Sequence, residues 1–255
     1  MCNDLFSIGP LTVHGYGLMI AIGVLVALFT GEAVAKKKGL NSDAIYPITF
    51  LCVFLGFFCA KILFCIVEWK AFVADPMSVL TGSGFVVYGG IMGGVLVAYL
   101  YCRAKKLNFW DYFDVVLPCV AIAQGFGRIG CFLAGCCYGK ETDSWLGIAF
   151  TNSTQAPNGV KLIPTQLFSA AGMFMIAALL FWYAAKTTHK KGQVGALYMI
   201  LYSIGRFAIE FFRNDFRGTV GPFSTSQFIS LFIFVAGIVL FVLRNKIEEE
   251  NKVSA

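Results

Sequence analysis

Residues 46–67 read YPITFLCVFLGFFCAKILFCIV, and this stretch decides the fold class of the chain. It carries a single charged residue, Lys61. A helix of about 20 apolar residues is long enough to cross the hydrocarbon core of a bilayer, and this run reaches that length. The segment therefore indicates an integral membrane protein.

Six further apolar runs are long enough to cross a membrane in the same way. They are Leu11–Thr30, Phe85–Cys102, Trp110–Arg128, Gln166–Ala185, Gly195–Phe212 and Gln227–Leu243. The run from Trp110 is the least regular, because Asp111, Asp114 and Pro118 interrupt its first half. We find no internal repeat and no linker. The sequence predicts an all-α polytopic membrane protein with about seven transmembrane helices, which forms one integral membrane domain over residues 1–255.

The composition agrees with this class. Of the 255 residues, 58% are hydrophobic and only 13% are charged, whereas an average soluble domain has about 25% charged residues. The net charge of +6 does not indicate nucleic-acid binding, because most basic residues fall in short loops between apolar runs. Such residues set the orientation of a membrane protein.

The basic loops predict which side faces the cytoplasm. Twelve of the 20 Lys and Arg residues follow the first, third, fifth and seventh runs. The side richer in Lys and Arg is normally cytoplasmic. We therefore expect the N-terminus outside and the C-terminus in the cytoplasm, with the loop Ile129–Thr165 outside.

Two arginines lie in or at the edge of membrane-spanning runs. Arg128 ends the fourth run, and Arg206 lies in the outward half of the sixth. A guanidinium at the bilayer centre costs about 2.5–3.5 kcal/mol on insertion scales, unless it pairs with an anion or faces a wet cavity. The pair predicts an outward-opening pocket for a negatively charged group, and a lipid phosphate is the commonest such group in a membrane.

The neighbours of Arg206 leave two interpretations open. Arg206, Glu210 and Arg213 are spaced so that they share one helix face. Glu210 either forms a structural ion pair that lets Arg206 survive burial, or orients the guanidinium before the substrate arrives. The two interpretations overlap, because the free edge of the guanidinium can still bind a phosphate through two hydrogen bonds.

Glycines surround Arg128, the other arginine proposed to bind the anion. Gly125, Gly127 and Gly130 match a dinucleotide fingerprint in spelling only, since no strand precedes them. They are expected to thin the helix end so that Arg128 and nearby backbone N–H groups can approach a ligand. The run Gly89–Gly94 has the small-residue spacing that lets membrane helices approach closely.

Three other polar residues have both structural and functional interpretations. Lys61 either reaches outward along the membrane or joins the anion site, and a structural role is favoured. Tyr16 and Tyr88 stand beside glycines, where an interfacial anchor and a place in the site are about equally supported.

The chain has nine cysteines, most of them inside apolar runs, where a free thiol packs as a small hydrophobic group. Cys131, Cys136 and Cys137 follow Arg128 closely. Their spacing is not that of a zinc ribbon or an iron–sulfur motif, and the two histidines are too few for a histidine-based site. Packing is favoured over an external disulfide, and a disulfide over a metal. We expect no metal and no cofactor.

Taken together, several motifs make the chain resemble the bacterial prolipoprotein diacylglyceryl transferases. They are Tyr16-Gly17-Leu18-Met19, Tyr88-Gly89-Gly90, Gly127-Arg128-Ile129-Gly130-x-Phe132, Pro164-Thr165-Gln166-Leu167, Gly205-Arg206-Phe207-x-x-Glu210-x-x-Arg213 and Ser226-Gln227. Their order and spacing and the seven-span topology agree with the family over most of the chain.

The resemblance implies a reaction. The family transfers the diacylglyceryl group of phosphatidylglycerol to the thiol of a lipobox cysteine in a secreted preprotein, and releases glycerol phosphate. The implied partners are that lipid, the lipobox signal peptide of a prolipoprotein and the membrane, with no nucleic acid. The implied catalytic residues are Arg128, Arg206 and Tyr88, and the implied substrate-binding residues are Tyr16, Gly89, Gly90, Gly127, Gly130, Gln166 and Glu210.

The chain departs from the family pattern at several polar positions. Tyr88 stands where the family usually has the histidine that is the candidate base, and a phenol is a base only if its pKa falls far below about 10. Cys131, Ala134 and Cys136 replace two asparagines and a glutamate. Two alternatives stay open for the function: a sister phospholipid-dependent transferase with a different acceptor, and a non-catalytic lipid or anion transporter.

Overall fold

The computed structural model describes residues 4–8, 11–82, 84–153, 155–186, 189–215 and 218–253. The chain divides into two compact units. Unit 1 consists of Met1–Thr30 and Phe113–Ala255, and unit 2 of Gly31–Tyr112. Two long helices, α1 (Gly15–Lys37) and α6 (Phe109–Ala134), run from one unit into the other.

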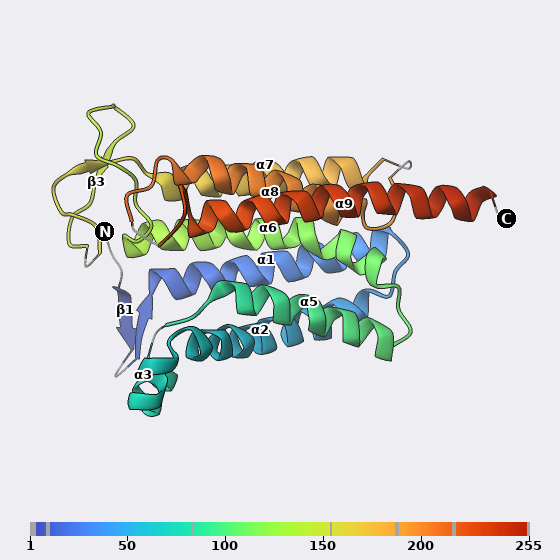
Figure 1. Cartoon of the computed structure of the whole chain (residues 1–255), viewed down its shortest axis with the longest axis horizontal. Helices are drawn as coiled ribbons and strands as arrows, with labels where there is room; N and C mark the ends of the chain where they lie inside the picture. Colours follow the sequence, from blue (N-terminus) through green and yellow to red (C-terminus); the bar gives the residue numbers. More distant parts are fainter. Residues whose placement is uncertain are drawn as a thin grey trace. The chain divides into compact units, whose positions relative to one another are not determined.

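The described chain is mainly helical, as Figure 1 shows. The remaining long helices are α2 (Ile45–Val67), α5 (Val87–Ala104), α7 (Thr165–Ala184), α8 (Gln193–Glu210) and α9 (Thr225–Val253). The short helical elements are η1 (Ser42–Ala44), α3 (Trp69–Ala74) and α4 (Pro76–Thr81). The strands are β1 (Asp4–Ile8), β2 (Leu11–His14), β3 (Ile148–Ala149), β4 (Lys161–Leu162), β5 (Thr219–Val220) and β6 (Phe223–Ser224).

Within the described residues, six helical segments are long and apolar enough to cross a membrane, so the class of polytopic helical membrane protein is confirmed. They are α1, η1 with α2, α5, α6, α7 and residues 225–247 of α9. Large apolar side chains cover their outer faces: Phe50, Phe54 and Phe58 of α2 are all more than 60% exposed. Such surfaces are stable in lipid and would be unfavourable in water.

Several predicted span boundaries differ from the helix bounds, and two of these differences bear on the candidate site. Residues Leu11–His14 form β2, which pairs antiparallel with β1, so the first helix begins only at Gly15. The fourth helix continues to Ala134, and Arg128 is therefore inside α6 rather than at its end. Apolar residues fit a strand as well as a helix over so few positions, so hydrophobicity alone did not locate the start of α1.

The helices of unit 1 pack through small residues. A Cβ atom added at Gly130 of α6 would lie 3.1 Å from the Tyr16 ring and 3.2 Å from Cβ of Met19 on α1. Gly125 meets the ring of Phe174 on α7 in the same way. A buried core cluster joins α6, α7 and α8 through Ala121, Met173, Ile176, Ala177, Leu180, Val194 and Tyr198. α8 packs in turn against α9.

The irregular first half of α6 has a structural explanation. Asp114 is buried, and its two carboxylate oxygens accept hydrogen bonds from the backbone N–H groups of Gly192 (2.6 Å) and Gly195 (2.9 Å). A carboxylate at a helix N-terminus satisfies free N–H groups and complements the helix dipole. Asp114 thus fixes the start of α8 against α6.

In unit 2, glycines bring α5 close to α2. A Cβ at Gly89 would lie 2.6 Å from the carbonyl oxygen of Cys59, and one at Gly93 would lie 2.6 Å from Cβ of Cys59. This confirms the predicted close approach of the glycine-rich helix. Lys61 donates hydrogen bonds to the carbonyl oxygens of Gly82 (2.7 Å) and Gly84 (3.1 Å), which supports its structural interpretation.

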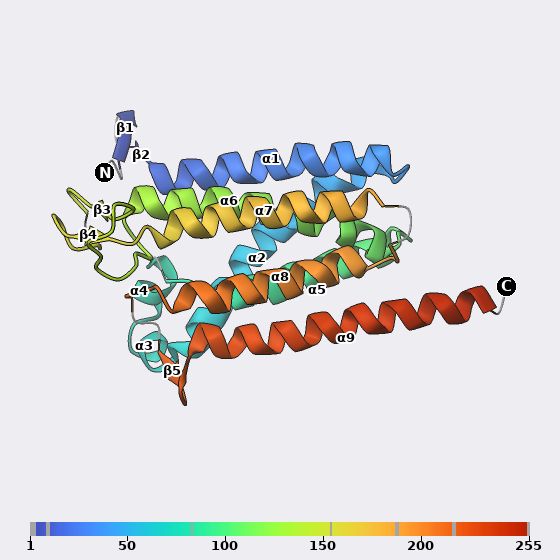
Figure 2. The ribbon, with the colours of Figure 1, turned by 90° about the horizontal axis from the view of Figure 1, so that it is seen from above.

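The hairpins that the described residues of unit 1 form, β1–β2, β3–β4 and β5–β6, lie at one end of its helices (Figures 1 and 2). The α6–α7 connection, the α8–α9 connection and the N-terminal hairpin all lie at this end in Figures 1 and 2. We call it the hairpin end. Arg128 and Arg206 both belong to the halves of their helices that lead to it.

Candidate functional site

Arg206 is oriented by two side chains from different elements. It lies on α8, where its guanidinium is 8% exposed. Nη1 bonds the carboxylate of Glu210 one turn further on, and Nη2 donates to the hydroxyl of Ser226 on α9 at 2.6 Å. The predicted Arg206–Glu210 pair is therefore present, and Ser226 holds the same guanidinium from the neighbouring helix.

Arg213 extends this polar network past the end of α8. Its Nε lies 3.8 Å from Glu210, but its main partner is Asp215, which accepts from Nε (2.8 Å) and from Nη2 (2.5 Å). Burial alone lowers the pKa of the Arg213 guanidinium, and the bonds to Asp215 raise it, with a net upward shift. The positive charge of Arg213 is thus balanced by Asp215, which accepts two hydrogen bonds from it, while Glu210 pairs mainly with Arg206.

Arg128 stands in a different environment. It is half-buried on α6, and no side chain in the described part of the chain forms a hydrogen bond or ion pair with its guanidinium. Tyr16 of α1 lies close enough to interact electrostatically with Arg128 and with Cys131, Cys136 and Cys137. The guanidinium is therefore available to an external anion.

Backbone pairing joins the two arginine-bearing regions at the hairpin end. After α6, Lys140 N–H donates to the carbonyl oxygen of Phe212 (2.9 Å), and Asn214 N–H donates to that of Tyr138 (3.2 Å). These bonds pair the segment that follows Arg128 with the segment that follows Arg206. The structure thereby brings the Tyr16–Arg128 region and the Arg206–Glu210–Ser226 group to the same end of unit 1.

Gln166, a predicted binding residue, is buried at the start of α7. Its Nε2 donates to the carbonyl oxygen of Cys136 at 2.7 Å, and the hydroxyl of Thr165 donates to that of Cys137 at 2.8 Å. Among the described residues, the side-chain oxygen of Gln166 has no hydrogen-bond partner. A buried acceptor without a partner is unusual and often indicates a water, an ion or a substrate group.

The three cysteines after Arg128 converge. The Sγ atoms of Cys131, Cys136 and Cys137 all lie within 4.8 Å of one another, and none of the three forms a disulfide bond. Hydrogen bonding to Cys131 and Cys137, together with burial, raises the pKa of the Cys136 thiol. Sequence spacing did not indicate this convergence.

The other predicted residues are placed differently. Tyr88, Gly89 and Gly90 begin α5 in unit 2, where Gly89 packs on α2, and their participation in the site stays a prediction. Gly130 packs against Tyr16, whereas nothing lies within 4 Å of a Cβ added at Gly127. The absence of a side chain at Gly130 therefore allows α6 to contact α1, whereas Gly127 takes part in no such contact.

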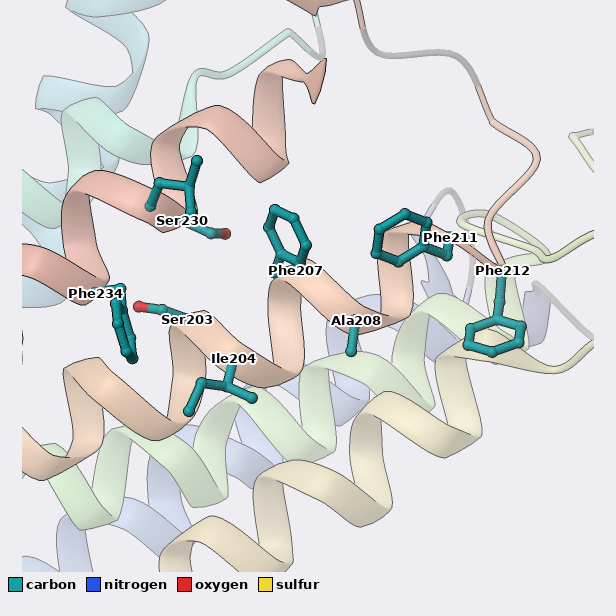
Figure 3. Close-up of a pocket in the computed structure, with 9 residues that line it drawn as sticks. Ser203, Ile204, Phe207, Ala208, Phe211, Phe212, Ser230 and Phe234 are labelled. Carbon is teal, nitrogen blue, oxygen red and sulfur yellow. The ribbon is translucent and has the colours of Figure 1, made fainter. Parts of the chain in front are cut away.

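An apolar groove of about 500 Å³ lies between α8 and α9, the two helices that carry Arg206 and Ser226 (Figure 3). Its walls are formed by Ser203, Ile204, Phe207, Ala208, Phe211, Phe212, Ser230, Leu231 and Phe234. The two serine hydroxyls donate to carbonyl oxygens of their own helices, at 2.5 Å for Ser203 and 2.7 Å for Ser230, so the groove has almost no free polar groups. Ser226, which holds Arg206, is one turn from Ser230.

Sequence reasoning missed Ser226, Asp215 and the groove as parts of the site. Ser226 carried a weak signal, because it belongs to one of the motifs that suggested the family. Asp215 is close to Arg213 in sequence, which is also a signal for pairing. The groove had none, since its side chains are ordinary apolar residues of two helices.

The described residues contain six apolar helices, and the buried, oriented guanidinium of Arg206 lies toward the hairpin end. Together they define a polytopic membrane protein with a polar site among apolar helices. A model of the prolipoprotein diacylglyceryl transferase family matches residues 3–243. The chain belongs to this family, which is a family of enzymes. The resemblance proposed from the motifs is confirmed.

Similar curated proteins carry the same name. The phosphatidylglycerol–prolipoprotein diacylglyceryl transferase of Clostridium tetani is 46% identical over 93% of this chain and 95% of its own length. The enzyme named phosphatidylglycerol–prolipoprotein diacylglyceryl transferase 2 of Clostridium perfringens is 47% identical over 91% of each chain. A relative from Dehalococcoides mccartyi is 32% identical over 96% of this chain. These similarities do not favour the non-catalytic transporter.

Proposed function

We propose that this enzyme transfers the diacylglyceryl group of phosphatidylglycerol to the lipobox cysteine of secreted prolipoproteins, forming a thioether and releasing glycerol phosphate. The observation that carries the proposal is the guanidinium of Arg206, which is buried on α8 and fixed by Glu210 and by Ser226 of α9. Names of relatives over nearly the whole chain support it.

The chemistry demands a cationic site. Breaking the bond between the glycerol carbon and the phosphate oxygen leaves a second negative charge on the phosphate. Preorganised donors in a site of low polarity stabilise such a charge far better than donors in water. Arg128 has no partner among the described side chains, and Arg206 is already oriented, so the two are proposed to bind the phosphate together.

The groove between α8 and α9 fits the remaining part of the lipid. Acyl chains gain free energy when apolar walls replace water, about 0.8 kcal/mol per buried CH₂. The groove is lined by phenylalanines, and it begins one turn from Ser226. We place an acyl chain there, with the headgroup directed toward Arg206.

The topology belongs to the same proposal. We propose that α8 is a seventh crossing, with the N-terminus outside and the C-terminus in the cytoplasm of the bacterial plasma (inner) membrane. α8 contacts both α7 and α9, so part of its surface is covered by protein rather than lipid, and this covered surface tolerates buried polar residues such as Ser203 and Arg206. The hairpin end then faces outward, where a translocated lipobox peptide is available.

Expression in cells depleted of their own transferase tests the function. We expect the chain to restore lipidation of a reporter lipoprotein, visible as a mass increase of one diacylglyceryl group. Unmodified precursor at normal expression of the chain would contradict the proposal. An Arg206→Ala variant expressed at the same level is the matched inactive control.

A further inference from the structure

Three thiols meet beside Arg128 in a way that simple packing does not require. Cys131 lies in the last turn of α6, and Cys136 and Cys137 lie just after it. Their sulfur atoms all come within 4.8 Å of one another. This is the one group of three or more His, Cys, Asp or Glu side chains with such convergence that the described residues contain.

The backbone around the thiols is built to hold them together. Gly135 has φ +70°, and a Cβ there would lie 2.3 Å from the hydroxyl of Ser153, so the chain can turn back only at a glycine. Cys136 N–H then donates to the carbonyl oxygen of Cys131 at 3.1 Å. Cys137 has φ +63°, a left-handed conformation that few non-glycine residues adopt.

Residues of α7 secure the same turn. Thr165 and Gln166 bond the carbonyl oxygens of Cys137 and Cys136. The side-chain oxygen of Gln166 belongs to the same amide group as the nitrogen that bonds the backbone carbonyl of Cys136, and it is buried and without a partner among the described residues. It is an independent sign that a water or a ligand group belongs at this position.

The number and type of these side chains select one chemistry. Thiolates prefer soft or borderline ions. Zinc sites with catalytic roles have three protein ligands and leave the fourth position of the tetrahedron to water or substrate. A disulfide between two of the three thiols would leave the third without a role.

We propose that Cys131, Cys136 and Cys137 bind one zinc ion, whose open fourth position takes the thiol of the acceptor cysteine. The second half of this proposal rests on the proposed function. It differs from our expectation from the sequence, which favoured packing, because the convergence of the sulfur atoms arises from the turn at Gly135 and from α7.

The step balances without a change of oxidation state. The acceptor thiol binds the ion and loses its proton to water, since a thiol that coordinates a metal is deprotonated. The resulting thiolate attacks the glycerol carbon of the lipid, and a sulfur–carbon bond forms. The carbon–oxygen bond to the phosphate breaks, and its electron pair stays on the phosphate oxygen, which Arg128 is placed to stabilise.

Metal content tests the site on the purified full chain in detergent. After loading with Zn²⁺ alone and washing, we expect about one ion per chain. Cys131→Ser, Cys136→Ser and Cys137→Ser should each lose the ion, whereas Cys119→Ser, which removes a buried thiol of α6 outside the group, should keep it. Loading with Co²⁺ should give thiolate-to-cobalt charge-transfer absorption in the wild type. A wild-type protein that binds neither ion would overturn the proposal.

Chelation of the wild type tests the role in transfer and needs no substitution that could prevent folding. We expect the rate of transfer to a lipobox peptide to fall at least about 100-fold, because removal of the ion removes the activation of the nucleophile. Added Zn²⁺ should restore the rate. Full transfer by metal-free enzyme would overturn the role in thiol activation and leave the proposed function standing. Stoichiometric zinc in a protein that transfers no lipid would instead contradict the proposed function.

Discussion

At Arg206, two hydrogen-bonding partners act on one side chain. Glu210 comes from the same helix, and Ser226 comes from α9 at 2.6 Å. Both fix the guanidinium before any substrate arrives. Such preorganisation lowers the cost of stabilising charge in the transition state, since the donors need not reorient.

Ser226→Ala tests this orientation. We expect kcat to fall about tenfold or more, because a hydrogen bond to a charged group contributes about 1.5–3 kcal/mol. KM should change less, since the charge of Arg206 remains, and Ser226→Thr should restore most of the rate. Ser169→Ala is the control, because that hydroxyl bonds its own helix at Thr165. Equal kcat in Ser226→Ala and wild type would show that Ser226 does not position Arg206.

Between elements, Gly130 sets the distance from α6 to α1. A Cβ at this position would lie 3.1–3.2 Å from Tyr16 and Met19. We predict that Gly130→Ala lowers the free energy of unfolding by about 1–3 kcal/mol, as overpacking does. Gly172→Ala on α7, where nothing lies within 4 Å of the added Cβ, should cost nothing or stabilise the helix. Thermal unfolding in detergent measures both, and equal melting temperatures would contradict the close contact.

The groove between α8 and α9 makes a second prediction about elements. Ala208→Trp should fill part of it and raise KM for a long-chain phosphatidylglycerol about tenfold, the equivalent of two methylenes left unburied. KM for a short-chain analogue should change little. Ile238→Trp, on an exposed face of α9, is the matched control. If Ala208→Trp affects both lipids equally, the groove does not hold an acyl chain.

Over the whole molecule, the distribution of Lys and Arg predicts one orientation. Alkaline phosphatase, which is active only outside the cytoplasm, should be active when fused after Gln155. Green fluorescent protein should fluoresce when fused after Lys252. Exchange of the two reporters should abolish both signals. The opposite pattern would place the hairpin end in the cytoplasm and contradict the proposed access of the lipobox peptide.

Most helices were predictable because length and apolarity determine them. Residues 46–67 were expected as a span, and α2 begins only one residue earlier, at Ile45. The pairing of Arg206 with Glu210 was also predictable, since residues four apart share a helix face.

Contacts between distant segments were not predictable in this way. Ser226 reaches Arg206 from another helix, and the three thiols meet only because Gly135 and Cys137 adopt left-handed conformations that Thr165 and Gln166 stabilise. Neither apolarity nor spacing records such turns.

The central claim is that Arg128 and Arg206 bind one phosphate, and a double-mutant cycle tests it most directly. Transfer rates are compared for wild type, Arg128→Lys, Arg206→Lys and the double variant, with Arg244→Lys near the other end of α9 as a control. Each site variant should lose about 100-fold, because lysine cannot form two parallel hydrogen bonds.

If both guanidinium groups hold the same phosphate, the two losses will not add, and the double variant will be at most about tenfold slower than either single variant. Losses that add to within about 0.5 kcal/mol, or a wild-type rate in either single variant, would contradict the claim.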